Sequence, residues 1–180
     1  MRLADLIDEQ SVLTGLKAGS RKQVFQELAE RAGGAVGVAP RVIFERLLER
    51  ERLGSTGIGA GIAIPHARVP GLERLFGMFA RLARPIRYDP LDGVDVDLVF
   101  LLLAPEAAGA DHLKALARVA RLLRDREFVA KIRGCMEESC IHALLTLPPD
   151  GLSTGAPELS RPVMHHRDRR TTNTLDLRPR

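Results

Sequence analysis

The sequence predicts an α/β fold in which helices pack against a β-sheet. Two amphipathic helical patterns come first, short apolar segments typical of strands follow, and further helical patterns close the folded part. This order of elements is typical of an α/β sandwich. The core must be aliphatic, because the chain has no Trp, one Tyr and six Phe. Its 180 residues suffice for one domain with a substantial core.

Two helices are expected in the first third of the chain, after a short N-terminal segment over residues 1–19. Ser20 can cap the first helix, and Gln23 stands three residues later, as a capping box requires. Apolar side chains then recur every three or four residues, and Gly33-Gly34 is expected to end the helix. Pro40 suits the first turn of a second helix, which finishes in a run of alternating charges.

Three strands and three helices are expected farther along the chain. Residues 96–104 form a nearly continuous apolar run, which indicates a central strand covered on both faces. Asp111 can cap a long helix that extends from His112 to about Arg124 and has Leu113 in its apolar stripe. The remaining expected elements are strands at 62–64 and 75–82 and shorter helices near 128–133 and 137–145.

The C-terminal part of the chain differs in character from the rest. From Pro148 onward apolar periodicity is lost, so we expect a folded domain over 1–147 and a disordered basic tail over 148–180. Residues 151–180 carry six basic and three acidic side chains, whereas residues 1–150 carry 21 basic and 20 acidic ones. Because the folded part is almost neutral, no nucleic-acid partner is expected, and binding through the tail is the alternative.

Membrane and metal-binding classes are disfavoured by the same inspection. The longest apolar run, 98–105, is far shorter than the roughly 18 residues of a membrane span, and the N-terminus has no apolar signal core. We therefore expect a cytoplasmic protein with no membrane insertion. Cys135 and Cys140 have no metal-binding spacing, so they are expected to be buried or inert thiols, and no metal site is expected.

A glycine-rich stretch over residues 54–61 invites comparison with nucleotide-binding loops. A P-loop requires Gly-Lys-Ser/Thr, but Ala60 follows Gly59 here. A dinucleotide-binding fingerprint requires a third glycine where this chain has Ile62, and no strand precedes the stretch. No ATP, NAD or other cofactor is therefore expected.

His66 is the residue best placed for chemistry. Pro65 fixes the backbone just before it, and a short apolar strand precedes both, so the imidazole has a stiff support. Imidazole is nucleophilic and partly neutral at physiological pH, which suits it to carry a phosphoryl group. Phosphoryl transfer also needs cations around the site. Arg50, Arg52 and Arg68 are the nearest candidates along the chain.

The segment 54–68, GSTGIGAGIAIPHAR, resembles the active-site signature of the IIA proteins of the bacterial phosphoenolpyruvate-dependent phosphotransferase system. The class it resembles is the fructose/mannitol/nitrogen class (type 2). The likeness covers about residues 1–146, and the opening Leu3-Ala4-Asp5-Leu6-Ile7 and the later Glu27-Leu28-Ala29 are most similar to the nitrogen-regulatory branch. The resemblance implies a mixed sheet with helices on both faces, as in the mannitol IIA proteins.

The resemblance also implies site residues and a phosphoryl donor. His66 would accept its group from a histidine phosphocarrier protein through a phosphohistidine intermediate. Arg50, sixteen residues earlier, matches the family's active-site arginine, and His112 matches its second histidine. Ser55 and Thr56 are expected to add hydroxyl or amide donors to the phosphoryl oxygens.

Two phosphotransfer roles follow from the resemblance. In the nitrogen-regulatory role, the phosphorylation state governs binding to regulatory target proteins. In the alternative, a sugar-specific IIA subunit passes the group to a IIB domain of a fructose or mannitol transporter. His66 serves both roles, so its presence does not separate them.

Overall fold

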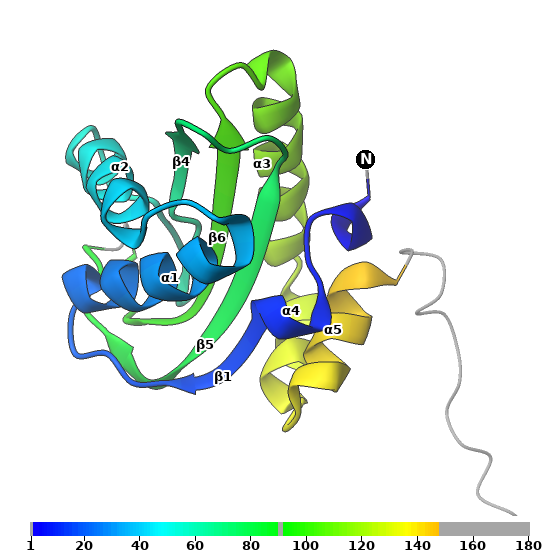
Figure 1. The fold of residues 1–180 in the computed structure, drawn as a ribbon. Helices are drawn as coiled ribbons and strands as arrows, with labels where there is room; N and C mark the ends of the chain where they lie inside the picture. Colours follow the sequence, from blue (N-terminus) through cyan, green and yellow to red (C-terminus); the bar gives the residue numbers. More distant parts are fainter. Residues whose placement is uncertain (1, 90–91, 148–180) are drawn as a thin grey trace, which may run out of the picture. The chain divides into compact units, whose positions relative to one another are not determined.

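The computed structural model describes residues 2–89 and 92–147, and the structural statements below concern these residues. Figure 1 follows the chain through them. In chain order the elements are the 3-10 turns η1 (Leu3–Asp5) and η2 (Glu9–Ser11), then β1 (Val12–Leu16), α1 (Arg21–Val36), α2 (Pro40–Arg52), β2 (Gly57–Gly59), β3 (Ile62–Ala63), β4 (His66–Val69), β5 (Phe76–Ile86), β6 (Val96–Pro105), α3 (Gly109–Leu123), α4 (Arg126–Gly134) and α5 (Glu138–Thr146).

The strands form one mixed, six-stranded sheet. Its order is β1-β5-β6-β3-β2, and β4 pairs with β6 as well. The β5–β6 and β2–β3 pairs are antiparallel, whereas β1–β5, β3–β6 and β4–β6 are parallel. Every residue of β6 from Leu98 to Ala104 is buried. The apolar run thus forms the central strand that the sequence predicts.

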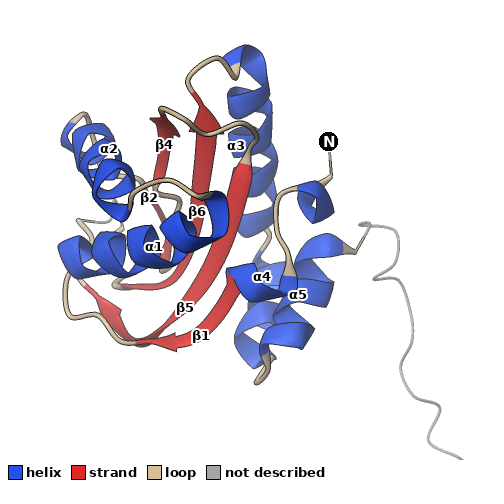
Figure 2. Ribbon diagram, in the orientation of Figure 1, coloured by secondary structure: helices blue, strands red, loops and turns tan. Residues whose placement is uncertain are grey.

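Helices cover both faces of this sheet (Figure 2). On one side α1 and α2 pack with alternate β6 residues, Val99, Leu101 and Leu103, into the main core. The intervening residues of β6 are buried on the other side, where α3 lies. The expected fold class is therefore confirmed.

The first helix begins as expected but ends later than the sequence indicates. Ser20 Oγ accepts the N–H of Gln23 at 3.3 Å, while Gln23 Oε1 accepts the N–H of Gly19. The helix continues through Gly33-Gly34 and ends at Gly37, whose φ of 70° is left-handed. A Cβ at Gly33 would lie 2.8 Å from Pro40 Cγ and from the Val38 carbonyl oxygen. The helix therefore needs a glycine there to approach α2 closely, and the predicted stop was wrong.

The long helix α3 also differs from its prediction. It begins at Gly109, so Asp111 lies within its first turn and is not its cap. Leu113 is 62% exposed, whereas the buried stripe contains His112, Ala115 and Val119. The sequence pattern assigned Leu113 to the buried face of this helix. In the structure its neighbour His112 is buried there instead.

Three strands, β1, β2 and β4, were not anticipated. β1 interrupts its pattern with Gly15, and β2 falls inside the glycine-rich stretch, so neither shows the alternation that marks a strand. His66 was expected after a strand, but it is the first residue of β4. The prediction for the tail, 148–180, lies outside the described residues. Among the helices that are described, none has the length and apolar character needed to cross a membrane.

The two cysteines form a disulfide between Cys135 and Cys140, so the prediction of unbridged thiols was wrong. In the structure α4 ends at Gly134, Cys135 is extended, and Cys140 lies near the start of α5. This break in the helix brings the two Cα atoms to 5.8 Å, within the usual range for a disulfide.

Candidate functional site

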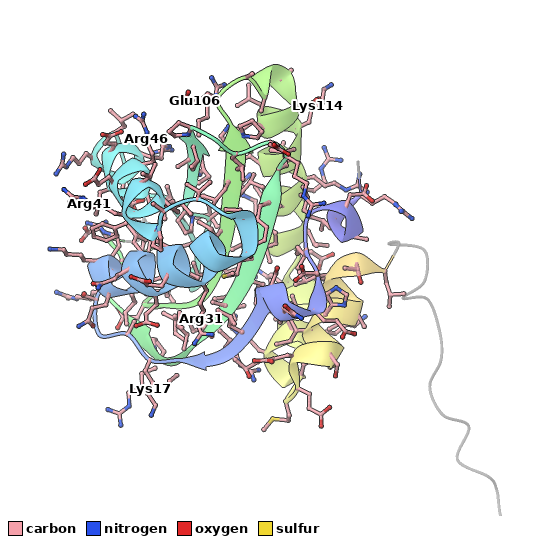
Figure 3. All side chains as sticks on the ribbon, in the orientation of Figure 1. Lys17, Arg31, Arg41, Arg46, Glu106 and Lys114 are labelled. Atoms are coloured by element: carbon pink, nitrogen blue, oxygen red, sulfur yellow. A yellow bond between two sulfur atoms is a disulfide. The ribbon has the colours of Figure 1, made fainter. Side chains whose placement is uncertain are left out.

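The site lies where the end of α2, the start of β4 and the first turns of α3 meet. The outer face of α2 carries exposed ion pairs between Arg41 and Glu45 and between Arg46 and Glu49. Arg41 and Arg46 are labelled in Figure 3. Arg50 does not join this pattern. Its Nε donates to Nε2 of His66 at 3.0 Å, and its Nη1 donates to the Gly54 carbonyl at 3.0 Å.

The partners of the His66 ring define its tautomer. Nδ1 lies 2.8 Å from the carbonyl oxygen of Ile64, which can only accept, so Nδ1 carries the proton. Nε2 then carries no proton, and its lone pair in the ring plane accepts the N–H of Arg50. A neutral His66 therefore presents Nε2 as its nucleophilic atom.

His112 lies beside this ring. The two ring centroids are 5.7 Å apart in an edge-to-face arrangement. His112 is 6% exposed, and its buried Nε2 has no hydrogen-bond partner among the described residues. A buried polar atom left unpaired costs on the order of 1–3 kcal/mol, so it calls for an explanation. A bound anion would supply the missing partner, and the nearby N-terminal end of α3 favours negative charge.

Both histidines are held neutral by their surroundings. Burial lowers the pKa of His66 below its usual value; the Ile64 carbonyl opposes this shift and the charge of Arg50 adds to it. Burial likewise lowers the pKa of His112, with smaller contributions from His66 and Arg68. Near neutral pH the site therefore combines two uncharged imidazoles with one permanent guanidinium cation.

Comparisons with known proteins identify the family of this chain. The family described as "Phosphoenolpyruvate-dependent sugar phosphotransferase system, EIIA 2" matches residues 5–147. This chain belongs to that family. It is 54% identical over 149 residues to the nitrogen regulatory protein of Bradyrhizobium diazoefficiens, covering 83% of this chain and 97% of the relative.

Solved structures support the same assignment. The IIA domain is similar to the nitrogen regulatory protein IIA-Ntr of Neisseria meningitidis, with a TM-score of 0.76 and 31% identity over 80% of this chain and 99% of that one. The mannitol IIA of Escherichia coli shares the fold, with a TM-score of 0.65 and 19% identity over 77% of this chain and 98% of that one. The predicted family and its nitrogen-regulatory branch are confirmed.

In this IIA domain the hydroxyls of Ser55 and Thr56 already have protein partners. Ser55 Oγ donates to the carbonyl of Tyr88 at 3.1 Å and accepts the N–H of Gly57 at 3.2 Å. Thr56 Oγ1 donates to Glu51 at 2.7 Å and lies 3.0 Å from the Tyr88 hydroxyl. These bonds stabilise the loop, and donation to phosphoryl oxygens stays a prediction.

Sequence reasoning missed Glu51, which is 9% exposed. It was taken for one of the charges that end α2. The spacing does carry a signal, because Ile43, Leu47 and Glu51 recur every four residues on the face that packs against the sheet. Arg52 and Arg68, by contrast, are exposed, and the described structure gives neither a bond to His66.

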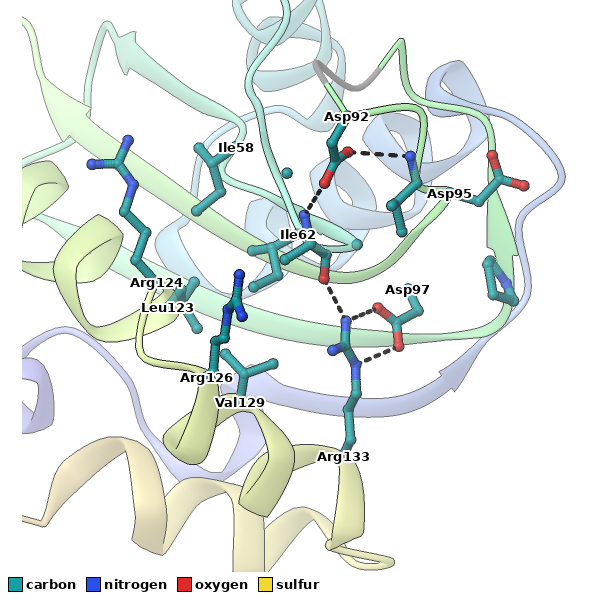
Figure 4. A pocket seen from close by; sticks show the side chains of 15 residues that line it. Ile58, Ile62, Asp92, Asp95, Asp97, Leu123, Arg124, Arg126, Val129 and Arg133 are labelled. Carbon is teal, nitrogen blue, oxygen red and sulfur yellow. Dashed lines mark hydrogen bonds and ion pairs between the residues drawn. The ribbon is translucent and has the colours of Figure 1, made fainter.

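The glycines of the IIA domain's loop serve close packing. Asp92 accepts the N–H of Ala60 at 2.6 Å, and Arg133 donates to the Ala60 carbonyl and to both carboxylate oxygens of Asp97 (Figure 4). A Cβ at Gly61 would lie 2.7 Å from Asp97 Oδ1. A cavity of about 1010 Å³ opens here, and its lining does not include the two histidines or Arg50.

Proposed function

We propose that this protein takes a phosphoryl group onto Nε2 of His66 and binds regulatory target proteins according to that state. The donor is a histidine phosphocarrier protein. The observation that carries the proposal is the arrangement around one lone pair. Nε2 of the neutral His66 ring accepts a hydrogen bond from Arg50. The ring of His112 lies beside it, and the Nε2 of His112 has no described partner.

The transfer step follows from the tautomer. The Nε2 lone pair attacks phosphorus, and the donor's nitrogen–phosphorus bond breaks with its electron pair returning to the donor imidazole. The His66 ring gains positive charge as the new bond forms. The Ile64 carbonyl, which accepts the Nδ1–H, stabilises that charge and holds the ring in place.

Arg50 and His112 act on the transferred group. Arg50 gives up its bond to the lone pair, and its guanidinium then donates to the phosphoryl oxygens beside Nε2. His112 Nε2, when it carries the ring proton, donates to another of these oxygens. Preorganised donors of this kind stabilise the charge that develops on the phosphoryl group.

The regulatory readout is electrostatic. A phosphoryl group adds nearly two negative charges to the exposed rim of the site, which can create or abolish a protein contact. We place the protein in the cytoplasm. We place the phosphotransfer domain within residues 1–147, because the family match ends at Leu147. The disulfide disagrees with this location, since reducing compartments disfavour such bonds.

A reconstituted reaction tests the proposal. Incubation with phosphoenolpyruvate, the first enzyme of the system and the carrier protein should add one acid-labile group, read by intact mass. His66→Ala should not be labelled, whereas His142→Ala, which alters a histidine on α5, should be labelled normally. Labelling of His66→Ala at another residue contradicts the proposal.

The sugar-specific role is tested with the same labelled protein. It predicts transfer to a IIB domain and formation of a sugar phosphate. This second role is supported by the description of the family, which names a sugar phosphotransferase system. Failure of that transfer, with state-dependent capture of a target protein, supports the regulatory role.

A further inference from the structure

The proposed reaction leaves one buried charge unused. Glu51 is next to Arg50 in the chain, yet its carboxylate points away from solvent and has three protein donors. It accepts the N–H of Thr56 at 3.1 Å, the hydroxyl of Thr56 at 2.7 Å and Nη1 of Arg21 at 3.2 Å. A buried carboxylate is costly unless it is paired in this way, so its place in the site calls for a reason.

The donors of Glu51 fix one short loop. The Thr56 hydroxyl donates its proton to Glu51. It can then only accept from the Tyr88 hydroxyl, which lies 3.0 Å away. The backbone N–H of Gly54 also bonds to the Glu51 carbonyl at 3.1 Å. Glu51 thus holds residues 54–56 through both its side chain and its backbone.

From this loop, one series of hydrogen bonds reaches Nδ1 of His66. The Thr56 carbonyl accepts the N–H of Ile64 at 2.9 Å. The Ile64 carbonyl in turn accepts the Nδ1–H of His66 at 2.8 Å. Three consecutive bonds therefore connect the Glu51 carboxylate with the atom that determines the tautomer.

A second series reaches the other ring nitrogen. The Gly54 carbonyl accepts Nη1 of Arg50 at 3.0 Å, and Nε of the same guanidinium donates to Nε2 of His66 at 3.0 Å. Both contacts that orient the imidazole are thus anchored on the loop that Glu51 fixes.

We propose that Glu51 is a positioning residue that orients His66 for attack by holding residues 54–56. This inference rests on the proposed role of His66 as the nucleophile. Misplacement of a reacting group by about 1 Å can lower the rate on the order of 10²-fold. The bonds by which Glu51 fixes the loop are therefore expected to affect the rate of phosphoryl transfer. Glu51 itself touches neither the nucleophilic atom nor the transferred group.

The test compares two charge-removing substitutions on the same helix. Glu51→Gln keeps the shape of the side chain but loses the charge and an acceptor, and Glu49→Gln does the same at an exposed position two residues earlier. For Glu51→Gln we expect the maximal rate of labelling by the carrier protein to fall about tenfold to a hundredfold, with the KM for the carrier unchanged within about twofold. Glu49→Gln should match the wild type in both.

Nitrogen NMR of the His66 ring gives a readout that needs no phosphotransfer. The wild type should show one tautomer, with the proton on Nδ1, and Glu51→Gln should show a mixture of the two. Tyr88→Phe removes one hydroxyl from the far end of the network. It should lower the rate about threefold, which supplies a second variant if Glu51→Gln does not fold.

The two proposals fail in different ways. A wild type that is not labelled at His66 overturns the proposed function, while the tautomer comparison still tests Glu51. A folded Glu51→Gln with the wild-type rate and a single Nδ1–H tautomer overturns the positioning role alone. The same holds for a Glu51→Gln defect that lies in KM and not in the maximal rate.

Discussion

Two polar clusters flank the glycine-rich stretch, and they differ in how completely their hydrogen bonds are made. On the α4 side, Asp92 accepts two backbone N–H groups, and Arg133 is bonded to Asp97 and to the Ala60 carbonyl. On the α2 side, the ring of His112 lies beside His66, and its buried Nε2 has no partner among the described residues.

Under the proposed function, this difference separates a structural cluster from a reactive one. A saturated cluster fixes backbone and gains nothing from a ligand. A cluster with a neutral nucleophile, a permanent cation and an unpaired buried atom is incomplete until an anion arrives. Substitutions in the first cluster should therefore change stability, and substitutions in the second should change rate.

The largest expected effect is on the reactive side. Arg50→Ala should lower the rate of labelling at His66 by about 10²- to 10³-fold, because it removes a donor and a cation aimed at the developing charge. Quench-flow measurement with the carrier protein checks this. Arg46→Ala, one turn earlier in α2, is the matched control and should retain the wild-type rate. Equal losses in both variants would assign the effect to the charge of the helix and not to the site.

A smaller effect is expected on the structural side. Gly61→Ala places a Cβ within 2.8 Å of Arg133 Nη2 and requires a φ of 79°. We expect the free energy of unfolding to fall by about 3 kcal/mol, as a sum of backbone strain and clash. Gly71 has a φ of 78° and nothing within 4 Å, so Gly71→Ala isolates the strain. Urea unfolding measures both, and equal losses would show that the packing around Gly61 contributes nothing.

Reduction of the disulfide should have a comparable or smaller effect. Cys135 and Cys140 enclose a short loop, so opening the bond should lower the free energy of unfolding by about 2 kcal/mol. Unfolding with and without a thiol reductant measures this, and Cys135→Ser/Cys140→Ser should be insensitive to the reductant. Rapid alkylation in freshly lysed cells then tells which form exists there, and fully alkylated thiols would support the cytoplasmic location.

The smallest effect concerns pH. Burial lowers the pKa of both His66 and His112, so in the folded protein both rings gain a proton at a lower pH than a free imidazole does. The rate of labelling should therefore decline at a lower pH than the titration of a free imidazole predicts. The unfolded chain binds protons first, so stability is complete above the unfolded pKa and declines as the pH falls through the folded values. His112→Gln should reduce this decline; a decline that begins above the pKa of a free imidazole contradicts the assignment.

The sequence predicted those structural features that are determined by neighbouring residues in the chain. The apolar run of β6, the Ser20 cap and the Pro40 start are each determined by nearby residues, and the structure has all three. The signature around His66 identified the family, and through it Arg50 and His112, which the fold brings together from distant parts of the chain.

The errors have a common physical cause in tertiary packing. Gly33 looks like a helix stop, but its hydrogen side chain is what lets α1 approach Pro40. Glu51 looks like a solvent-exposed charge, but Arg21 and Thr56, from two other segments, satisfy its carboxylate. The two helices near 128–133 and 137–145 were predicted, but no local pattern shows that the segment between them brings the two sulfur atoms together.

The bond between Arg50 and the His66 lone pair has a consequence for selectivity. In the resting protein the nucleophile is already engaged, so a small phosphate ester in solution meets a masked atom. A docking protein can use its own binding energy to displace the guanidinium at the moment of transfer. Under the proposed function we therefore expect the resting site to discriminate against small phosphate esters and to accept the group from a protein donor.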